Sequence, residues 1–326
     1  MSAKTSGLER AAKAVGKVRP PKLSSVARKM EFPYRAPSTP RTVEPLPKKE
    51  TTGAGYDTEW ARRFPARWAR VMLLEAVVRP AIAAVARPER RGLDNLQGLD
   101  GPVIFAANHH SHVDAGLMLT SLPEPFRYRV FAVAAADYFF KTRVTGAASA
   151  LVLNAIPFER AKVTRRSADQ AAELLDDGWS MVIFPEGGRS PDGWGQPFRG
   201  GAAYLALRCD VPIVPVHLEG TGRILHKGSK KLQPASTIVT FGRPIHAAEG
   251  EDSRRLAARL EHEVSALADE VGTDWYTART RAHAGATPTL AGPTDGAWRR
   301  AWSVSERTRR RRRRTTSTAK RWPDLS

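Results

Sequence analysis

Three histidines and one aspartate lie within six residues of one another, at His109, His110, His112 and Asp114. A histidine paired with a carboxylate can act as a general base. The carboxylate fixes the imidazole tautomer, and it stabilises the imidazolium that forms when the ring takes a proton. The residue types in this segment therefore indicate proton-transfer chemistry.

The spacing alone leaves the identity of the base open. His110 and Asp114 are four residues apart, so they would share one face of a helix. His109 and Asp114 are five residues apart, which places them about 140° apart on a regular helix. They could meet only if His109 lies before the helix, in the turn that leaves the preceding strand.

Two other interpretations of the same segment are open at this point. His109 and His112, three residues apart, could bind a metal with Asp114 as a third ligand. Against this, the chain has no His-Glu-x-x-His motif and only one cysteine, Cys209, which also rules out an intrachain disulfide. The histidines could also serve only to cap and pack the structure.

The elements around this segment predict an α/β fold. Apolar runs predict buried strands at residues 103–107, 130–134, 181–184, 213–217 and 238–241. Helices are expected at 116–122, 167–176, 201–208 and 253–271. This alternation predicts a mixed, largely parallel sheet flanked by helices. The histidines directly follow the first of these strands, and such folds place their sites at strand ends.

Three further motifs follow along the chain. Residues 184–190, with the sequence FPEGGRS, come after a predicted strand. Their glycines would let the backbone approach an anion and Arg189 would add a fixed charge, although the segment is also a plausible turn. In residues 158–160, FER, an arginine near a strand end could bind phosphate, which alone is a weak signal. Residues 211–216 are apolar, which favours a role in shaping a wall of the site over a role in the chemistry.

Together with the histidine segment, these motifs resemble the four ordered blocks of the glycerolipid acyltransferases over roughly residues 60–270. The best-known members of that family are the 1-acyl-glycerol-3-phosphate acyltransferases. The resemblance implies that His109 is the base and Asp114 its partner. It also implies direct acyl transfer, in which His109 deprotonates a glycerol hydroxyl that attacks an acyl thioester, without a covalent acyl-enzyme.

The resemblance also implies the substrate site. Arg160, Glu186 and Gly187 would bind the glycerol phosphate, Arg189 is a reasonable further phosphate ligand, and the fourth block would lie on the donor side. Two positions depart from the family pattern: Gly188 stands where threonine is most common, and Asn154 where the second block usually opens with glycine.

The implied reaction moves an acyl group from acyl-CoA or acyl carrier protein to a lysophospholipid. With 1-acyl-glycerol-3-phosphate as acceptor, the product is phosphatidic acid. No prosthetic group or metal is expected. Glycerol-3-phosphate, another lysolipid or a glycolipid is the alternative acceptor.

Composition divides the chain into four parts. Residues 1–57 are expected to be a disordered basic extension, 58–88 an amphipathic interfacial helix region, 89–274 the catalytic domain and 275–326 a disordered arginine-rich tail. In residues 58–88, aromatic and arginine side chains fit either a core-packing helix or a membrane anchor. The resemblance favours the anchor, and hence a membrane surface as partner on the cytoplasmic face.

The net charge of +19 lies mostly at the two ends. Residues 1–59 hold 12 Lys/Arg against 6 Asp/Glu, and residues 275–326 hold 13 against 3. A basic nucleic-acid-associated protein is thus an alternative, but the nearly neutral middle shows no recognised binding motif, so no specific nucleic acid is expected. The first 29 residues do not form a secretory signal, and no uninterrupted apolar run reaches the length of a membrane span.

Overall fold

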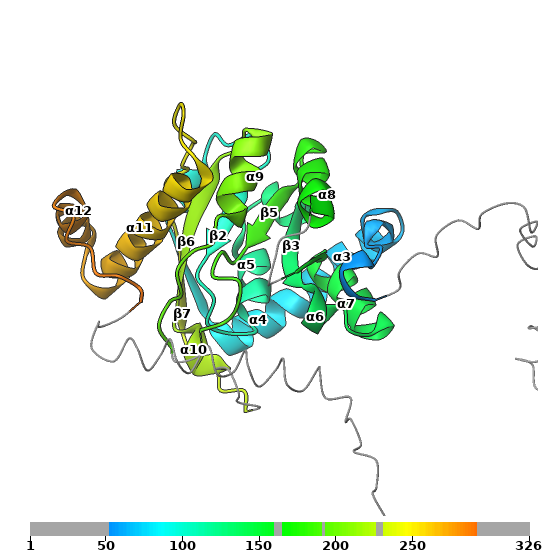
Figure 1. The fold of residues 1–326 in the computed structure, drawn as a ribbon. Helices are drawn as coiled ribbons and strands as arrows, with labels where there is room; N and C mark the ends of the chain where they lie inside the picture. The colour runs from blue at the N-terminus through cyan, green and yellow to red at the C-terminus, as the bar shows by residue number, and fades with distance from the viewer. Residues whose placement is uncertain (1–51, 160–164, 191–192, 226–230, 292–326) are drawn as a thin grey trace, which may run out of the picture. The chain divides into compact units, whose positions relative to one another are not determined.

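A computed structural model describes residues 52–159, 165–190, 193–225 and 231–291 (Figure 1). Arg160 and most of the two predicted basic ends lie outside these residues. The predicted disorder of residues 1–51 and 292–326 therefore stays a prediction.

The centre of the fold is a seven-stranded sheet with the order β1-β7-β6-β2-β5-β3-β4. Only the β6–β7 pair is antiparallel; every other neighbouring pair is parallel. The predicted mixed, largely parallel sheet is confirmed. The strands are β1 (Pro88–Arg91), β2 (Ile104–Ala107), β3 (Val130–Ala135), β4 (Ile156–Phe158), β5 (Ser180–Ile183), β6 (Ile213–Glu219) and β7 (Thr237–Phe241).

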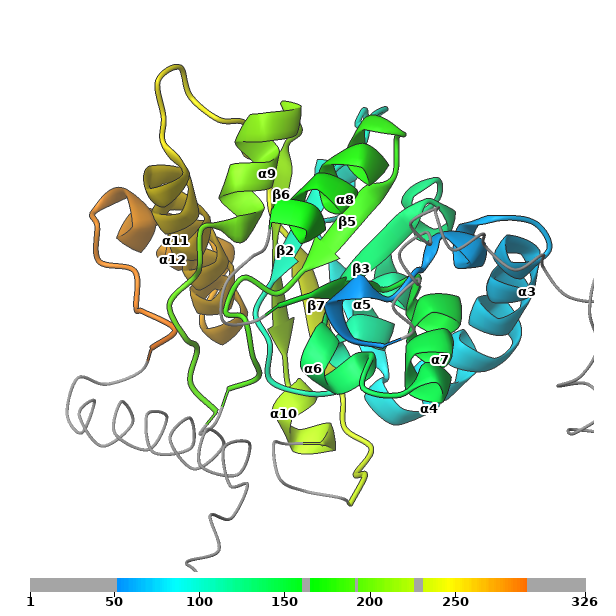
Figure 2. The same ribbon diagram turned by 45° about the vertical axis from the view of Figure 1, so that its right-hand side comes forward.

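Two hydrophobic clusters cover the two faces of this sheet. In β2, Ile104 and Ala106 pack with α8 (Arg165–Asp176), α9 (Gly201–Cys209) and α11 (Ser253–Gly272). Phe105 and Ala107 point to the other face, toward α4 (Arg79–Ala86) and α5 (Asp114–Ser121). Because both faces are buried, the inner strands appear in the sequence as continuous apolar runs. Figures 1 and 2 show α9 and α11 apart from α4 and α5.

The predicted strands correspond to β2, β3, β5, β6 and β7, whereas β1 and β4 were missed. β1 is an edge strand with largely exposed polar side chains, so it carries no apolar run. β4 is only three residues long. Further helical elements are η1 (Gly53–Gly55), η2 (Glu59–Arg62), η4 (Leu93–Leu96), η5 (Phe126–Tyr128), α6 (Ala136–Phe139), α7 (Arg143–Leu153) and α10 (Thr221–Ile224).

The predicted helix region near residues 58–88 forms α3 (Ala66–Leu73), a π-helical turn η3 (Leu74–Val78) and α4 in direct succession. Pro65 precedes α3, but Pro80 does not end the helix. The π turn just before Pro80 pairs the N–H of Arg79 with the carbonyl of Leu74. Among the residues that the structure describes, no helix combines the length and apolar character needed to span a bilayer.

The inner boundaries of both predicted disordered ends differ from the structure. Residues 52–57 belong to the fold, because Gly53 N–H donates to the Phe140 carbonyl over 2.8 Å and the Tyr56 ring packs on Phe140. At the other end, α12 (Trp275–His283) begins at the N-cap Asp274 and packs against α11. Low hydrophobicity concealed both segments, which are held by a few tertiary contacts.

Tyr56 tests this corrected boundary. Tyr56→Ala should lower the free energy of unfolding by about 2 kcal/mol, because it removes a ring that packs on the buried Phe140. Val144→Ala, a nearby exposed position, should stay within about 0.5 kcal/mol of wild type. Urea unfolding measures both. Equal stabilities for Tyr56→Ala and wild type would show that residues 52–57 do not contribute to the fold.

Candidate active site

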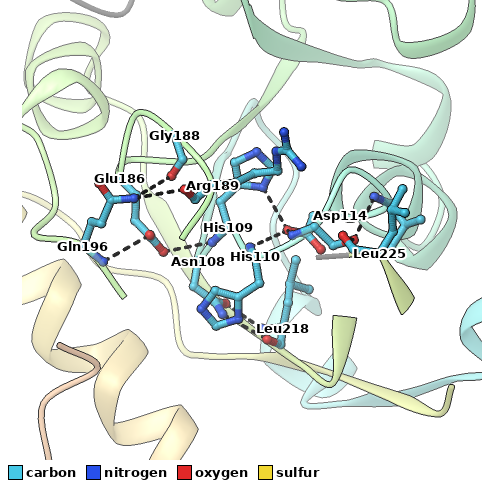
Figure 3. Close-up of polar contacts among 12 residues, drawn as sticks. Asn108, His109, His110, Asp114, Glu186, Gly188, Arg189, Gln196, Leu218 and Leu225 are labelled. Atoms are coloured by element: carbon cyan, nitrogen blue, oxygen red, sulfur yellow. Dashed lines mark hydrogen bonds and ion pairs between the residues drawn. The ribbon is translucent and has the colours of Figure 1, made fainter. Parts of the chain in front are cut away.

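His109 and Asp114 form a hydrogen-bonded pair at the carboxyl end of β2. His109 Nδ1 donates to Asp114 Oδ2 over 2.8 Å (Figure 3). The Asp114 side chain is fully buried, whereas 19% of the His109 side chain is exposed. Since Nδ1 is committed to the carboxylate, Nε2 is the ring nitrogen left to take a proton.

The turn between β2 and α5 brings this pair together. The backbone N–H groups of His110 and Ser111 also donate to Asp114 Oδ2, each over 2.8 Å. Helix α5 begins only at Asp114, so His109 lies in the turn and not on the helix. The helical spacing that made His110 a candidate therefore does not apply. The spacing of five residues allowed His109 to meet Asp114 only if His109 lies before the helix, and the structure places it there.

The rings of the other two histidines have different surroundings from the ring of His109. The His110 ring is largely buried, and this burial lowers its pKa below the usual value; neighbouring His217 adds to the decrease and Asp114 opposes it. His112 stacks on Tyr138 with ring centroids 5.3 Å apart. Across the described residues, no group of three or more His, Cys, Asp or Glu side chains is placed to hold a metal ion. The geometry thus favours the His109–Asp114 base over the metal interpretation.

The loop after β5 holds His109 from the other side. The backbone N–H of His109 donates to Glu186 Oε1 over 2.9 Å, and the His109 carbonyl accepts from the Ser190 N–H over 2.8 Å. The imidazole stacks on the Phe184 ring, with centroids 4.3 Å apart and planes at 22°. Residues 184–190 therefore fix both the backbone and the ring plane of His109.

Glu186 occupies a different place from the one that the resemblance implied. Its side chain is 1% exposed and does not line the cavity. One carboxylate oxygen accepts from His109 N–H and the other from Gln196 N–H, over 2.9 and 3.1 Å. Burial raises its pKa to about 7, although both backbone bonds oppose the increase. In this structure Glu186 is buried and holds the backbone of two loops.

Asn108 joins the end of β2 to β6. Its amide nitrogen donates to the Leu218 carbonyl and its amide oxygen accepts from the Leu218 N–H, over 2.9 and 2.7 Å. Ser111 Oγ donates to the Leu225 carbonyl over 2.8 Å. These two motif residues anchor the turn to the segments around β6, which explains why the histidine segment carries them.

Gln196 was not recognised from the sequence. Besides its backbone bond to Glu186, its side-chain nitrogen donates to the carbonyls of Gly188 and Arg189, each over 3.2 Å. It thereby clamps the glycine-rich loop from outside the motif. A single glutamine six residues beyond a motif carries no sequence signal for this role.

A cavity of about 200 Å³ opens beside His109. Gly187 and Arg189, both predicted to bind substrate, line it, as does Gly188. None of residues 211–215 lines it, because β6 and its approach are buried in the core. The other lining residues are His112, Ala115, Ala132, Val133, Ala134, Ala135, Tyr138, Phe139, Leu153, Phe158, Glu159, Ile183, Phe184, Pro185, Arg199, Gly201 and Ala202.

The raised pKa of Glu186 predicts a pH-dependent stability. The folded protein holds the proton of Glu186 more tightly than the unfolded chain does, so this contribution is full below pH 4.5 and is lost as the pH rises through about 7. Urea unfolding in steps across this window should show a smaller decline for Glu186→Gln than for wild type. Identical slopes would mean that Glu186 does not titrate in this window.

Comparisons with known proteins agree with this geometry. Residues 87–219 match the family model described as Acyltransferase. The chloroplastic 1-acyl-sn-glycerol-3-phosphate acyltransferase of Brassica napus is 32% identical over 165 residues, 49% of this chain and 46% of the relative. The enzyme of that name from Pseudomonas aeruginosa is 30% identical over 179 residues, 54% of this chain and 65% of the relative.

A solved structure has the same fold. The crystal structure of the 1-acyl-sn-glycerophosphate acyltransferase PlsC from Thermotoga maritima matches with a TM-score of 0.53 and 24% identity, over 67% of this chain and 84% of that one. The chain spans about half the length of the plant relative. Residues 87–219 thus resemble an acyltransferase domain, and the relatives that match this part of the chain are named 1-acyl-sn-glycerol-3-phosphate acyltransferases.

Proposed function

We propose that this chain transfers a fatty acyl group from an acyl thioester to a hydroxyl of a lysophospholipid. The observation that carries the proposal is the 2.8 Å bond between His109 Nδ1 and Asp114 Oδ2 beside a cavity. The names of the relatives support 1-acyl-glycerol-3-phosphate as acceptor and phosphatidic acid as product.

The proposed reaction is a direct transfer. His109 Nε2 takes the proton of the acceptor hydroxyl while the hydroxyl oxygen attacks the thioester carbonyl. The carbon–sulfur bond then breaks, and the imidazolium returns the proton to the departing thiolate. Asp114 stabilises the imidazolium between these steps. The thioester is already activated, so the scheme needs no prosthetic group, and acyl-CoA or acyl carrier protein can supply it.

The cavity suits an amphiphilic substrate. Apolar side chains form one wall, contributed by β3 and by Phe139 and Leu153. Arg189 lies at the polar part with Gly187 and Gly188. We assign the acyl chain to the apolar wall and the glycerol phosphate to the Arg189 side. Arg160, which lies outside the described residues, stays a predicted phosphate ligand.

The N-terminal helices have features of a membrane-surface anchor. Trp60, Phe64, Trp68 and Met72 are exposed, with 87% of Phe64 accessible. Arg70 from the same region is instead buried, donates to the Ala61 carbonyl and lies over the Trp179 ring. Burial lowers its pKa to about 10. The exposed aromatic side chains favour insertion into a bilayer interface. On the predicted cytoplasmic face of the membrane, the bilayer would supply the lysophospholipid acceptor.

The catalytic pair gives the first test. His109→Ala should lower kcat about 100-fold or more, because general-base catalysis is lost. His110→Gln should retain most activity, since the variant keeps the backbone N–H through which His110 donates to Asp114. Release of free CoA from acyl-CoA with 1-acyl-glycerol-3-phosphate measures both, and circular dichroism checks folding. A folded, inactive His110→Gln together with an active His109→Ala would reverse the assignment.

The anchor gives a second test. The double variant Phe64→Ala, Trp68→Ala should bind vesicles containing anionic phospholipid at least about 10-fold more weakly, because two aromatic side chains no longer enter the interface. Tyr204→Ala removes an exposed aromatic side chain from α9 and is the matched control. Vesicle sedimentation measures binding. Equal loss in the control, or no loss in the double variant, would contradict this anchor.

A further inference from the structure

Arg199 belongs to none of the four sequence motifs, yet its side chain lines the same cavity as His109 and Arg189. Its N–H donates to the Pro185 carbonyl over 3.0 Å. The preceding residue, Phe198, donates its N–H to Glu261 Oε2 over 2.9 Å. The backbone that carries Arg199 is therefore fixed both to the loop after β5 and to α11.

The Arg199 guanidinium lies directly against the backbone of Gly187. A β-carbon at Gly187 would come within 2.9 Å of the Arg199 Cζ and Nε atoms. Gly187 has a φ of +69°, so it is a glycine for its backbone conformation as well as for this close contact. Gly188 differs, since a β-carbon there would meet no atom within 4 Å. The loop thus seats Arg199 at Gly187 and leaves open space at Gly188.

The charges in the cavity favour an anion. Among the described residues that line it, the charged side chains are Arg189, Arg199 and the exposed Glu159. Two arginines against one carboxylate leave a net positive charge. A guanidinium presents a planar fork of donors that matches phosphate oxygens, and such charge-assisted bonds are stronger than neutral ones.

We propose that Arg199 is a phosphate ligand, which together with Arg189 forms an anion site over Gly188. This inference rests on the proposed acyltransferase function. Ser190 bonds the His109 carbonyl and Pro185 bonds the Arg199 N–H, so one loop ties the anion site to the base. The phosphate belongs either to the acceptor glycerol phosphate or to the CoA part of the donor.

The test measures KM and kcat for Arg199→Ala with four substrates. The acceptors are 1-acyl-glycerol-3-phosphate and 1-acylglycerol, which lacks the phosphate. The donors are acyl-CoA and acyl-pantetheine, which lacks the phosphates. Arg208→Ala is the matched control, because Arg208 lies at the other end of α9 and outside the cavity.

With an acceptor phosphate in the site, Arg199→Ala raises KM for 1-acyl-glycerol-3-phosphate roughly 10- to 100-fold, and leaves KM for 1-acylglycerol unchanged. Arg199→Lys restores part of the affinity. An increase in KM for acyl-CoA but not for acyl-pantetheine supports the same phosphate site and assigns the phosphate to the donor. Changes shared by all four substrates, or no change, overturn the proposal.

Failure of the proposed function has a separate signature. Wild type would then transfer no acyl group to any of these acceptors. The phosphate site is in that case tested by calorimetric titration with glycerol-3-phosphate. Binding that is lost in Arg199→Ala and kept in Arg208→Ala supports the site. Equal binding by both variants, or none by wild type, overturns it.

Discussion

One carboxylate oxygen organises the turn between β2 and α5. Asp114 Oδ2 accepts from the His109 ring and from the N–H groups of His110 and Ser111, all over 2.8 Å. Three donors converge on it because the chain leaves β2, turns once and begins α5 at Asp114. Such donors offset much of the cost of burying a carboxylate. The bond that orients the His109 ring and the two bonds that form the turn therefore share one acceptor. Removing the Asp114 carboxylate would remove all three bonds.

The parallel sheet supplies the second constraint. β2, β5, β3 and β4 are neighbours that run in the same direction, so their carboxyl ends meet at one edge. The loop after β5 reaches His109 through Glu186, Ser190 and Phe184. Glu186 also bonds Gln196, which clamps the glycine-rich loop. The glycine-rich loop and His109 are thereby held together as one unit. Most of the contacts between them involve backbone groups or the buried Glu186 carboxylate, which does not line the cavity.

The sequence predicted what local patterns encode. The buried strands appeared as apolar runs, and the spacing of His109 and Asp114 required a turn before the helix. Elements held by tertiary contacts left weaker patterns: β1 has a polar exposed sequence, β4 is very short, and α12 has few buried side chains. At the site, Gln196 and Arg199 were missed because a glutamine or arginine beyond a motif resembles a surface residue. The position of Glu186, buried on the backbone of His109 and Gln196, was not foreseen because a family resemblance names a residue and not the direction of its side chain.

The most direct measurement of the central claim is the tautomer of His109, observed by nitrogen-15 NMR of histidine-labelled protein and assigned by comparison with His109→Ala. The account predicts a proton on Nδ1 and an unprotonated Nε2 in the neutral ring, and it predicts that Asp114→Asn changes this resonance pair. A neutral His109 with its proton on Nε2, unaffected by Asp114→Asn, would contradict it, because such a ring could neither donate to Asp114 nor accept a proton from the cavity side.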